Sequence, residues 1–175
     1  MTESAAPAIV FVEHVLWTPG EDWHEAITHL AGRFARATPL DAPAVLGAGA
    51  LHEQLVVLNT WASSASVDLD RELGRWLDEH LSMHLRPRPE TTRAVRALAA
   101  VGSVHAASAL PARAAEAIAR HAGCWRSIET LHDGLLDAAA VGTVVDSLHP
   151  RLIVAAPPTP LPTDVDAQPL LGASA

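Results

Sequence analysis

One strand-turn-helix unit limits most strongly how this chain can fold. A short apolar strand over 103–108 ends at Ser108, the chain turns at Pro111, and an alanine-rich helix then runs to a stop at Gly123. Proline suits the first turn of a helix, and glycine suits the position just after its end. The unit therefore predicts a strand whose carboxyl end leads directly into a helix.

The segments around this unit also alternate between helices and strands. Their hydrophobic patterns predict a helix over 90–100, a strand over 126–131, a helix over 135–148 and a strand over 152–156. Strands that alternate with helices of this length favour right-handed crossovers. The expected architecture is therefore a parallel sheet with helices on both faces.

An earlier strand is predicted near the start of the chain. Residues 8–17 form an almost continuous apolar run, interrupted only by Glu13 and His14. Such a run is typical of a strand that is buried on both faces, as the inner strands of a parallel sheet are.

The region between this strand and the alternating segments is predicted to be helical. Apolar residues recur at helical spacing in three stretches, and a connector rich in proline and glycine follows the first of them. The predicted helices are 18–37, 50–61 and 67–85, and the connector is 38–49. Two prolines in alternate positions then end the helical region, because proline cannot continue a helix.

The charge and the cysteine content of the chain limit which partners it is expected to bind and in which cellular compartment it is expected. The chain has 12 basic residues, all arginine, against 20 acidic ones, which gives a net charge of −8. Binding to nucleic acid needs basic surface, so no nucleic-acid partner is expected. One cysteine excludes an internal disulfide, and neither a signal sequence nor a membrane span is recognisable. We therefore expect a cytoplasmic protein with no membrane association.

The order of these segments resembles that of the haloacid dehalogenase (HAD) superfamily. In that family a Rossmann-like parallel sheet core commonly carries a helical cap inserted after the first strand. The second strand ends in a serine or threonine that holds the phosphoryl group, and the next helix ends in a His-x-Gly-like turn. Ser108 and His121-Ala122-Gly123 occupy these places here. The resemblance covers residues 8–17 and 87–156.

The resemblance implies an α/β fold with a defined division of the chain. We expect a HAD-like core made of residues 1–17 and 87–156, a helical cap insert over 18–86, and a flexible proline-rich tail over 157–175.

The residues that carry the family's chemistry are missing at the first strand. Family members attack the substrate with an aspartate at the end of this strand, and phosphatases use a second aspartate two residues later. The aligned positions hold Val12 and His14, with Glu13 between them. A shift of one residue places Glu13 in the nucleophile's position but gives Val15 as its partner. Neither register restores the pair of carboxylates that covalent attack and magnesium binding require.

The later family motifs are also altered. The family's third motif supplies a lysine or arginine, and the predicted helix over 135–148 has neither. Its fourth motif places acidic metal ligands after the last core strand, where this chain has Ala155-Ala156-Pro157-Pro158. The oxygen ligands that magnesium prefers are therefore absent, and we expect no metal and no cofactor.

Histidines offer a second possibility for a metal. His80 and His84 are four residues apart on one predicted helix, which places both on the same face. A zinc site needs a third protein ligand, and the sequence nominates none.

Two functions from different classes remain. The first is a catalytically degenerate HAD-like protein without phosphatase activity, which binds a protein partner, a second copy of itself or a small apolar ligand. The alternative is a metal-independent enzyme with different chemistry in the cleft between cap and core. Its acid-base candidates are His14 and Glu13.

Three residues are candidates for ligand binding. Ser108 is the position that the resemblance implies, and Trp17 and Trp23 could line an apolar pocket at the entrance of the helical insert. The competing interpretation is structural, because serine is common at strand ends and tryptophans pack the cores of small helical units.

Overall fold

Four short strands form a single parallel sheet in the centre of the molecule. The computed structural model describes residues 6–34, 42–84 and 88–169. The strands lie in the order β3-β2-β1-β4. Their bounds are β1 (Ala8–Phe11), β2 (Val104–Ala107), β3 (Thr130–His132) and β4 (Leu152–Val154). The predicted parallel α/β architecture is confirmed.

The strand β1 is the axis of the sheet. Its residue Val10 pairs with Ala106 of β2 on one side and with Val154 of β4 on the other. All four residues of β1 are buried. This burial explains why its sequence is continuously apolar, since neither face of an inner parallel strand meets water.

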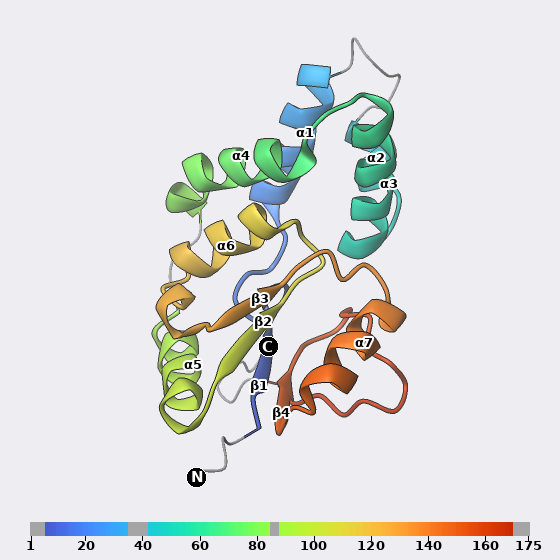
Figure 1. The fold of residues 1–175 in the computed structure, drawn as a ribbon. Coiled ribbons are helices and arrows are strands. Elements are labelled where there is room, and N and C mark those ends of the chain that lie inside the picture. The colour runs from blue at the N-terminus through green and yellow to red at the C-terminus, as the bar shows by residue number, and fades with distance from the viewer. Residues whose placement is uncertain (1–5, 35–41, 85–87, 170–175) are drawn as a thin grey trace.

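Helices cover both faces of the sheet (Figure 1). The helices α5 (Pro89–Val101) and α6 (Ala112–His121) lie on one side, and α7 (Ala138–Leu148) lies on the other. This arrangement is the one that right-handed crossovers give when the chain moves from β1 to β3 and then back to β4. Gly123 follows α6 with a φ of 76°, which is a conformation that glycine adopts without strain.

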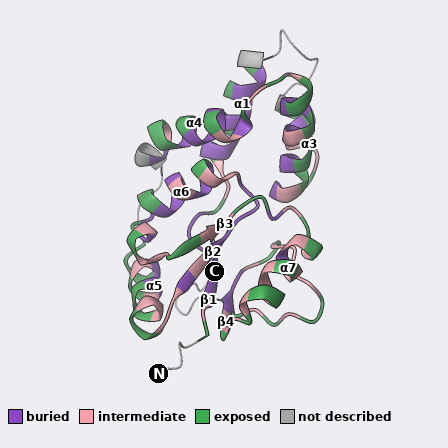
Figure 2. Ribbon diagram, in the orientation of Figure 1, coloured by how far each residue is buried: buried purple, intermediate pink, exposed green. Residues whose placement is uncertain are grey.

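Of the helices that separate β1 from β2 along the chain, the first four lie beyond one end of the sheet (Figure 1). They are α1 (Glu21–Phe34), α2 (Ala42–Leu46), α3 (Leu51–Ser64) and α4 (Leu69–His84). Buried residues occur in β1, β2 and β4 and along α1, α3 and α4 (Figure 2), and the apolar ones belong to one continuous cluster. The helical insert therefore shares its core with the sheet, and the boundaries of a separate cap domain stay a prediction.

The helix α4 packs closely against α6, and Gly74 allows this approach. A Cβ atom on Gly74 would lie 2.5 Å from Cβ of Arg113 and 3.2 Å from the backbone nitrogen of Ala114. A side chain at this position would therefore force the two helices apart.

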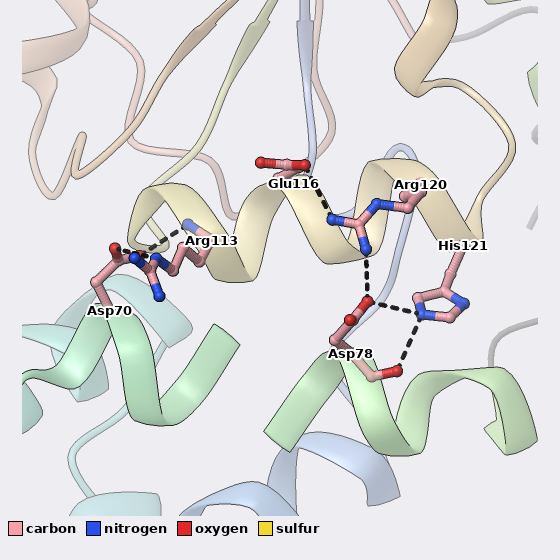
Figure 3. A network of polar contacts seen from close by, with 6 residues as sticks. All are labelled: Asp70, Asp78, Arg113, Glu116, Arg120 and His121. Carbon is pink, nitrogen blue, oxygen red and sulfur yellow. Dashed lines mark hydrogen bonds and ion pairs between the residues drawn. The ribbon is translucent and has the colours of Figure 1, made fainter. Parts of the chain in front are cut away.

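Ion pairs line the outer edge of this helix contact (Figure 3). Asp78 of α4 accepts a hydrogen bond from Arg120 of α6 at 2.7 Å and lies 3.4 Å from His121. Asp70 pairs with Arg113 at 3.6 Å. Because these side chains are largely exposed, each pair contributes little to stability, and apolar packing holds the helices together.

The structure corrects three details of the predicted elements. The first strand ends at Phe11 rather than near Trp17, because the N–H groups of Leu16 and Trp17 both donate to the carbonyl of Val12 and turn the chain. The predicted connector contains the short helix α2. The strand expected over 126–131 is a 3₁₀ turn at Trp125–Ser127 followed by β3.

The described part of the tail runs back along the sheet. Residues 157–169 contain no helix and none of the four strands. Gln168 nevertheless bridges to β4, where its N–H donates to the carbonyl of Ile153 at 2.8 Å. Leu161 and Val165 pack against the apolar cluster.

Among the described residues, every helix is too short or too polar to cross a bilayer.

Two matched glycine substitutions test the contact between α4 and α6. Gly74→Ala should lower the free energy of unfolding by about 1–3 kcal/mol, because its methyl group overlaps Arg113. Gly32→Ala, in α1 with open space around it, should raise this free energy by about 0.5–1 kcal/mol. Urea unfolding measures both values. Equal effects of the two changes would show that the helices are not in close contact.

Candidate functional site

The candidate site lies where β1 and β2 reach their carboxyl ends. Val12 continues the pairing beyond β1, because its N–H donates to the carbonyl of Ala107 at 2.9 Å. The chain then turns at His14, which has a φ of 64°. The carboxyl ends of neighbouring parallel strands meet at one edge of a sheet, so Glu13 comes to lie beside Ser108.

The carboxyl group of Glu13 points into the protein, and the whole residue is 5% exposed to solvent. Its Oε1 accepts hydrogen bonds from Oγ of Ser108 and from the backbone N–H of Leu110, the latter at 3.3 Å. Ser108 is fully buried, and its Oγ also accepts from the N–H of Leu110 at 3.1 Å. The acid thus joins the end of β1 to the turn that leads into α6.

Burial raises the pKa of Glu13 above its ordinary value of 4.5. Removing a carboxylate from water disfavours its charged form. The hydrogen bonds from Ser108 and the backbone act in the opposite direction, but burial is the larger effect. The site therefore favours a neutral carboxylic acid at Glu13.

His14 lines a small cavity next to this acid. Burial lowers the pKa of its imidazole, because a charged ring would lose hydration there. Its backbone N–H donates to the carbonyl of Trp17 at 2.6 Å, which closes the tight turn after β1. The turn therefore holds an imidazole in its neutral form at the mouth of the sheet.

The cavity is formed by five separate parts of the chain. Its volume is about 20 Å³. By the same measure a single water molecule needs about 10–15 Å³. The lining residues are Phe11, Glu13, His14, Leu51, His52, Ala109, Leu135, Pro158, Thr159 and Pro160. The cleft as it stands has room for about one water molecule.

The two candidate tryptophans lie away from this cavity, in the core beneath the helical insert. Trp17 donates its indole N–H to Asp22 at 2.6 Å, and Trp23 donates its own to Gln54 at 2.8 Å. Their rings meet edge to face, with centroids 6.1 Å apart. Packing and hydrogen bonding explain their burial, and contact with a ligand stays a prediction for both.

The structure therefore brings together only some of the predicted site residues. Glu13 contacts Ser108, and Glu13 and His14 both line the cavity. The N–H of Leu110 and the tail residues 158–160 were not predicted from the sequence. A backbone donor carries no side-chain signal in a sequence. The proline content of the tail predicted only the absence of regular structure.

The described residues do not fit the magnesium ion that the family resemblance implies. Glu13 turns its Oε1 toward two hydrogen-bond donors and favours the neutral acid, which is a poor ligand for a hard cation. No group of three histidine, cysteine or acidic residues in the described ranges is arranged to hold a metal. The Nδ1–H of His80 donates to the carbonyl of Trp76, 2.7 Å away, and the His80 ring stacks on that indole.

Comparison with known proteins identifies the fold. No protein-family model and no curated protein matches the sequence. A haloacid dehalogenase-like hydrolase from Streptococcus pneumoniae is similar in structure, with a TM-score of 0.53 and 9% identity over 86% of this chain and 75% of that one. At this identity the likeness shows the fold alone, and that fold is HAD-like, as the sequence predicted.

Two further solved structures are similar to this chain. One is assigned as a β-phosphoglucomutase from Thermotoga maritima, with 17% identity, a TM-score of 0.49 and coverage of 85% of this chain and 74% of that one. The other is a haloacid dehalogenase-like hydrolase from Burkholderia xenovorans, with 15% identity, a TM-score of 0.45 and coverage of 86% and 71%.

The protonation of Glu13 makes stability depend on pH in a defined direction. Because its pKa is raised in the folded state, Glu13 binds more protons in the folded protein than in the unfolded chain above pH 4.5. Its contribution to the free energy of unfolding should therefore fall as pH rises through this range, by at most about 1.4 kcal/mol per pH unit. Glu13→Gln should remove this loss, so its stability relative to the wild type should increase with pH.

Urea unfolding of both proteins between pH 4 and pH 8 measures this difference. Glu129→Gln, at an exposed position before β3, is the matched control and should follow the wild type. A Glu13→Gln protein that becomes less stable than the wild type as pH rises would show that the buried group is a carboxylate.

Proposed function

We propose that this chain is a HAD-fold protein that does not hydrolyse phosphate esters and acts by binding. The observation that carries this proposal is the inward orientation of Glu13, the acid nearest the end of β1. Its oxygen is engaged by Ser108 and by Leu110.

The chemistry of covalent attack supports the proposal. A carboxylate nucleophile must be ionised and must reach the substrate. Glu13 favours its neutral form and is buried, and Val12, which occupies the aligned aspartate position, has no oxygen on its side chain. Among its described residues, the site therefore lacks an accessible, ionised carboxylate that could attack a phosphate ester.

A metal-independent enzyme is the alternative that the sequence left open. It would use the neutral imidazole of His14 as a base, and a substrate would have to lie beside that ring. The cavity beside His14 measures about 20 Å³, so a substrate, like any organic ligand, could reach that ring only after part of the lining moved. Acid-base catalysis would also need its second group, and the carboxyl group of Glu13 is held by Ser108 and by the N–H of Leu110. This engagement of Glu13 favours binding over catalysis.

The composition of the chain supports the expected environment and partners. A net charge of −8 disfavours contact with nucleic acid or with an anionic membrane surface. The cysteine Cys124 is buried and free, which suits the reducing conditions of a cytoplasm. A protein partner, a second copy or a small apolar ligand accordingly remains the proposed class of binding partner.

A phosphatase assay tests the proposal. The wild-type protein, incubated with p-nitrophenyl phosphate and magnesium at neutral pH, should release no more nitrophenol than buffer alone. Glu13→Gln should behave identically, because Glu13 performs no chemistry on phosphate. Turnover by the wild type that Glu13→Gln abolishes would overturn the proposal.

A further inference from the structure

The cavity at the carboxyl ends of the strands is mainly apolar. Six of its ten lining residues carry apolar side chains, and three of the ten come from the tail. The tail residues are Pro158, Thr159 and Pro160. The tail therefore fills space that the sheet and the helical insert would otherwise enclose.

The hydrogen bonds of the tail segment are local to this segment and to Ala156, the residue before it. Thr159 donates both its N–H and its Oγ1 hydrogen to the carbonyl of Ala156, at 3.1 and 2.6 Å. Leu161 donates to Thr159, and Val165 donates to the carbonyl of Pro162. Among the described residues, the hydrogen bonds found for 157–167 thus stay within this stretch and Ala156. Moving it off the cavity therefore breaks no hydrogen bond between 157–167 and the sheet or the insert, and only the bonds that hold the next residue, Gln168, to β4 have to open.

The segment is fastened at its two ends. It begins where β4 ends, and Gln168 ties its far end to β4 through two hydrogen bonds. The N–H of Gln168 donates to Ile153 at 2.8 Å, and its carbonyl accepts from the N–H of Ala155 at 3.3 Å. Between these points only packing holds it, including the approach of Pro162 to Gly142 of α7.

We propose that residues 157–167 form a displaceable strap over a binding site for a small, uncharged, mainly apolar molecule. Such a molecule would replace Pro158–Pro160 against Phe11, Leu51 and Leu135. This inference rests on the proposed binding function and specifies the ligand class for the same cleft.

The character of the site selects against charged ligands. Burial favours the neutral forms of both Glu13 and His14, so neither of them offers a formal charge to an anion or a cation. The hydroxyl-bearing Ser108 and the N–H of Leu110 are already engaged by Glu13. Contacts with apolar surface are therefore the main source of affinity, with His14 and His52 available for one or two hydrogen bonds.

The uncharged dye N-phenyl-1-naphthylamine is a suitable probe, because its fluorescence rises in apolar surroundings. A strap that covers the site for nine-tenths of the time lowers the apparent affinity about tenfold. Gln168→Pro removes the N–H that holds the end of the strap to Ile153. It should therefore bind the dye about tenfold more tightly than the wild type.

Two further variants test whether the loss of the N–H causes the gain in dye affinity and whether the dye binds in the cavity. Gln168→Ala keeps the backbone N–H and should bind like the wild type, because the side chain of Gln168 is exposed. Adding His52→Glu to Gln168→Pro places a charge at the cavity and should weaken dye binding at least about fivefold. An unchanged affinity in Gln168→Pro would refute the strap, and a gain that His52→Glu leaves intact would place the dye elsewhere.

A measurement on the unaltered chain covers the case in which Gln168→Pro fails to fold. Hydrogen exchange of the wild type with saturating dye should speed up at Gln168 while the amides of β1 stay protected. Unchanged exchange at Gln168 would contradict the strap. Either outcome is independent of the phosphatase assay, so a protein that hydrolyses phosphate esters could still possess the strap.

Discussion

The contact between the carboxyl group of Glu13 and Ser108 is the interaction on which the carboxyl end of the sheet depends. It joins the turn after β1 to the turn that opens α6, and both residues are buried. A polar group in this position is tolerated because it is hydrogen-bonded, and the neutral acid avoids the larger cost of a buried charge. The position of His14 and the shape of the cavity both follow from this turn.

The same contact separates the fold of this chain from the chemistry that the fold often supports. A HAD-like sheet places the residues after β1 beside the residues after β2 by topology alone. Whether those residues catalyse a reaction depends on their side chains, since a fold can host many functions. Here the acid faces Ser108 and the backbone, and the tail occupies the space above it.

Local sequence signals predicted the framework well. The apolar run from Ala8 identified a doubly buried strand, and Gly123 marked the end of α6. The end of β1 was missed because Val15, Leu16 and Trp17 continue the apolar run and are buried too, although they belong to the turn after β1. Hydrophobicity reports burial, and it does not report whether a buried residue belongs to a strand or to a turn.

The candidate site was only partly predictable for a related reason. Glu13 was identified as a candidate because it interrupts an apolar run, but its orientation depends on a partner 95 residues away in sequence. The tail was predicted to lack regular structure, and residues 157–169 contain no helix. Its place over the cavity depends on the pairing of Gln168 with β4, for which a short polar stretch gives no pattern.

The ionisation of Glu13 is the most direct test of this account. Carbon-13 NMR of selectively labelled protein reports the side-chain carboxyl carbon of each glutamate as pH is varied, and Glu13→Gln assigns the signal. The account predicts that the Glu13 signal stays in its protonated position when the pH passes the ordinary value of 4.5. A signal that titrates at or below this value would show an ionised carboxylate in the site and would contradict the account.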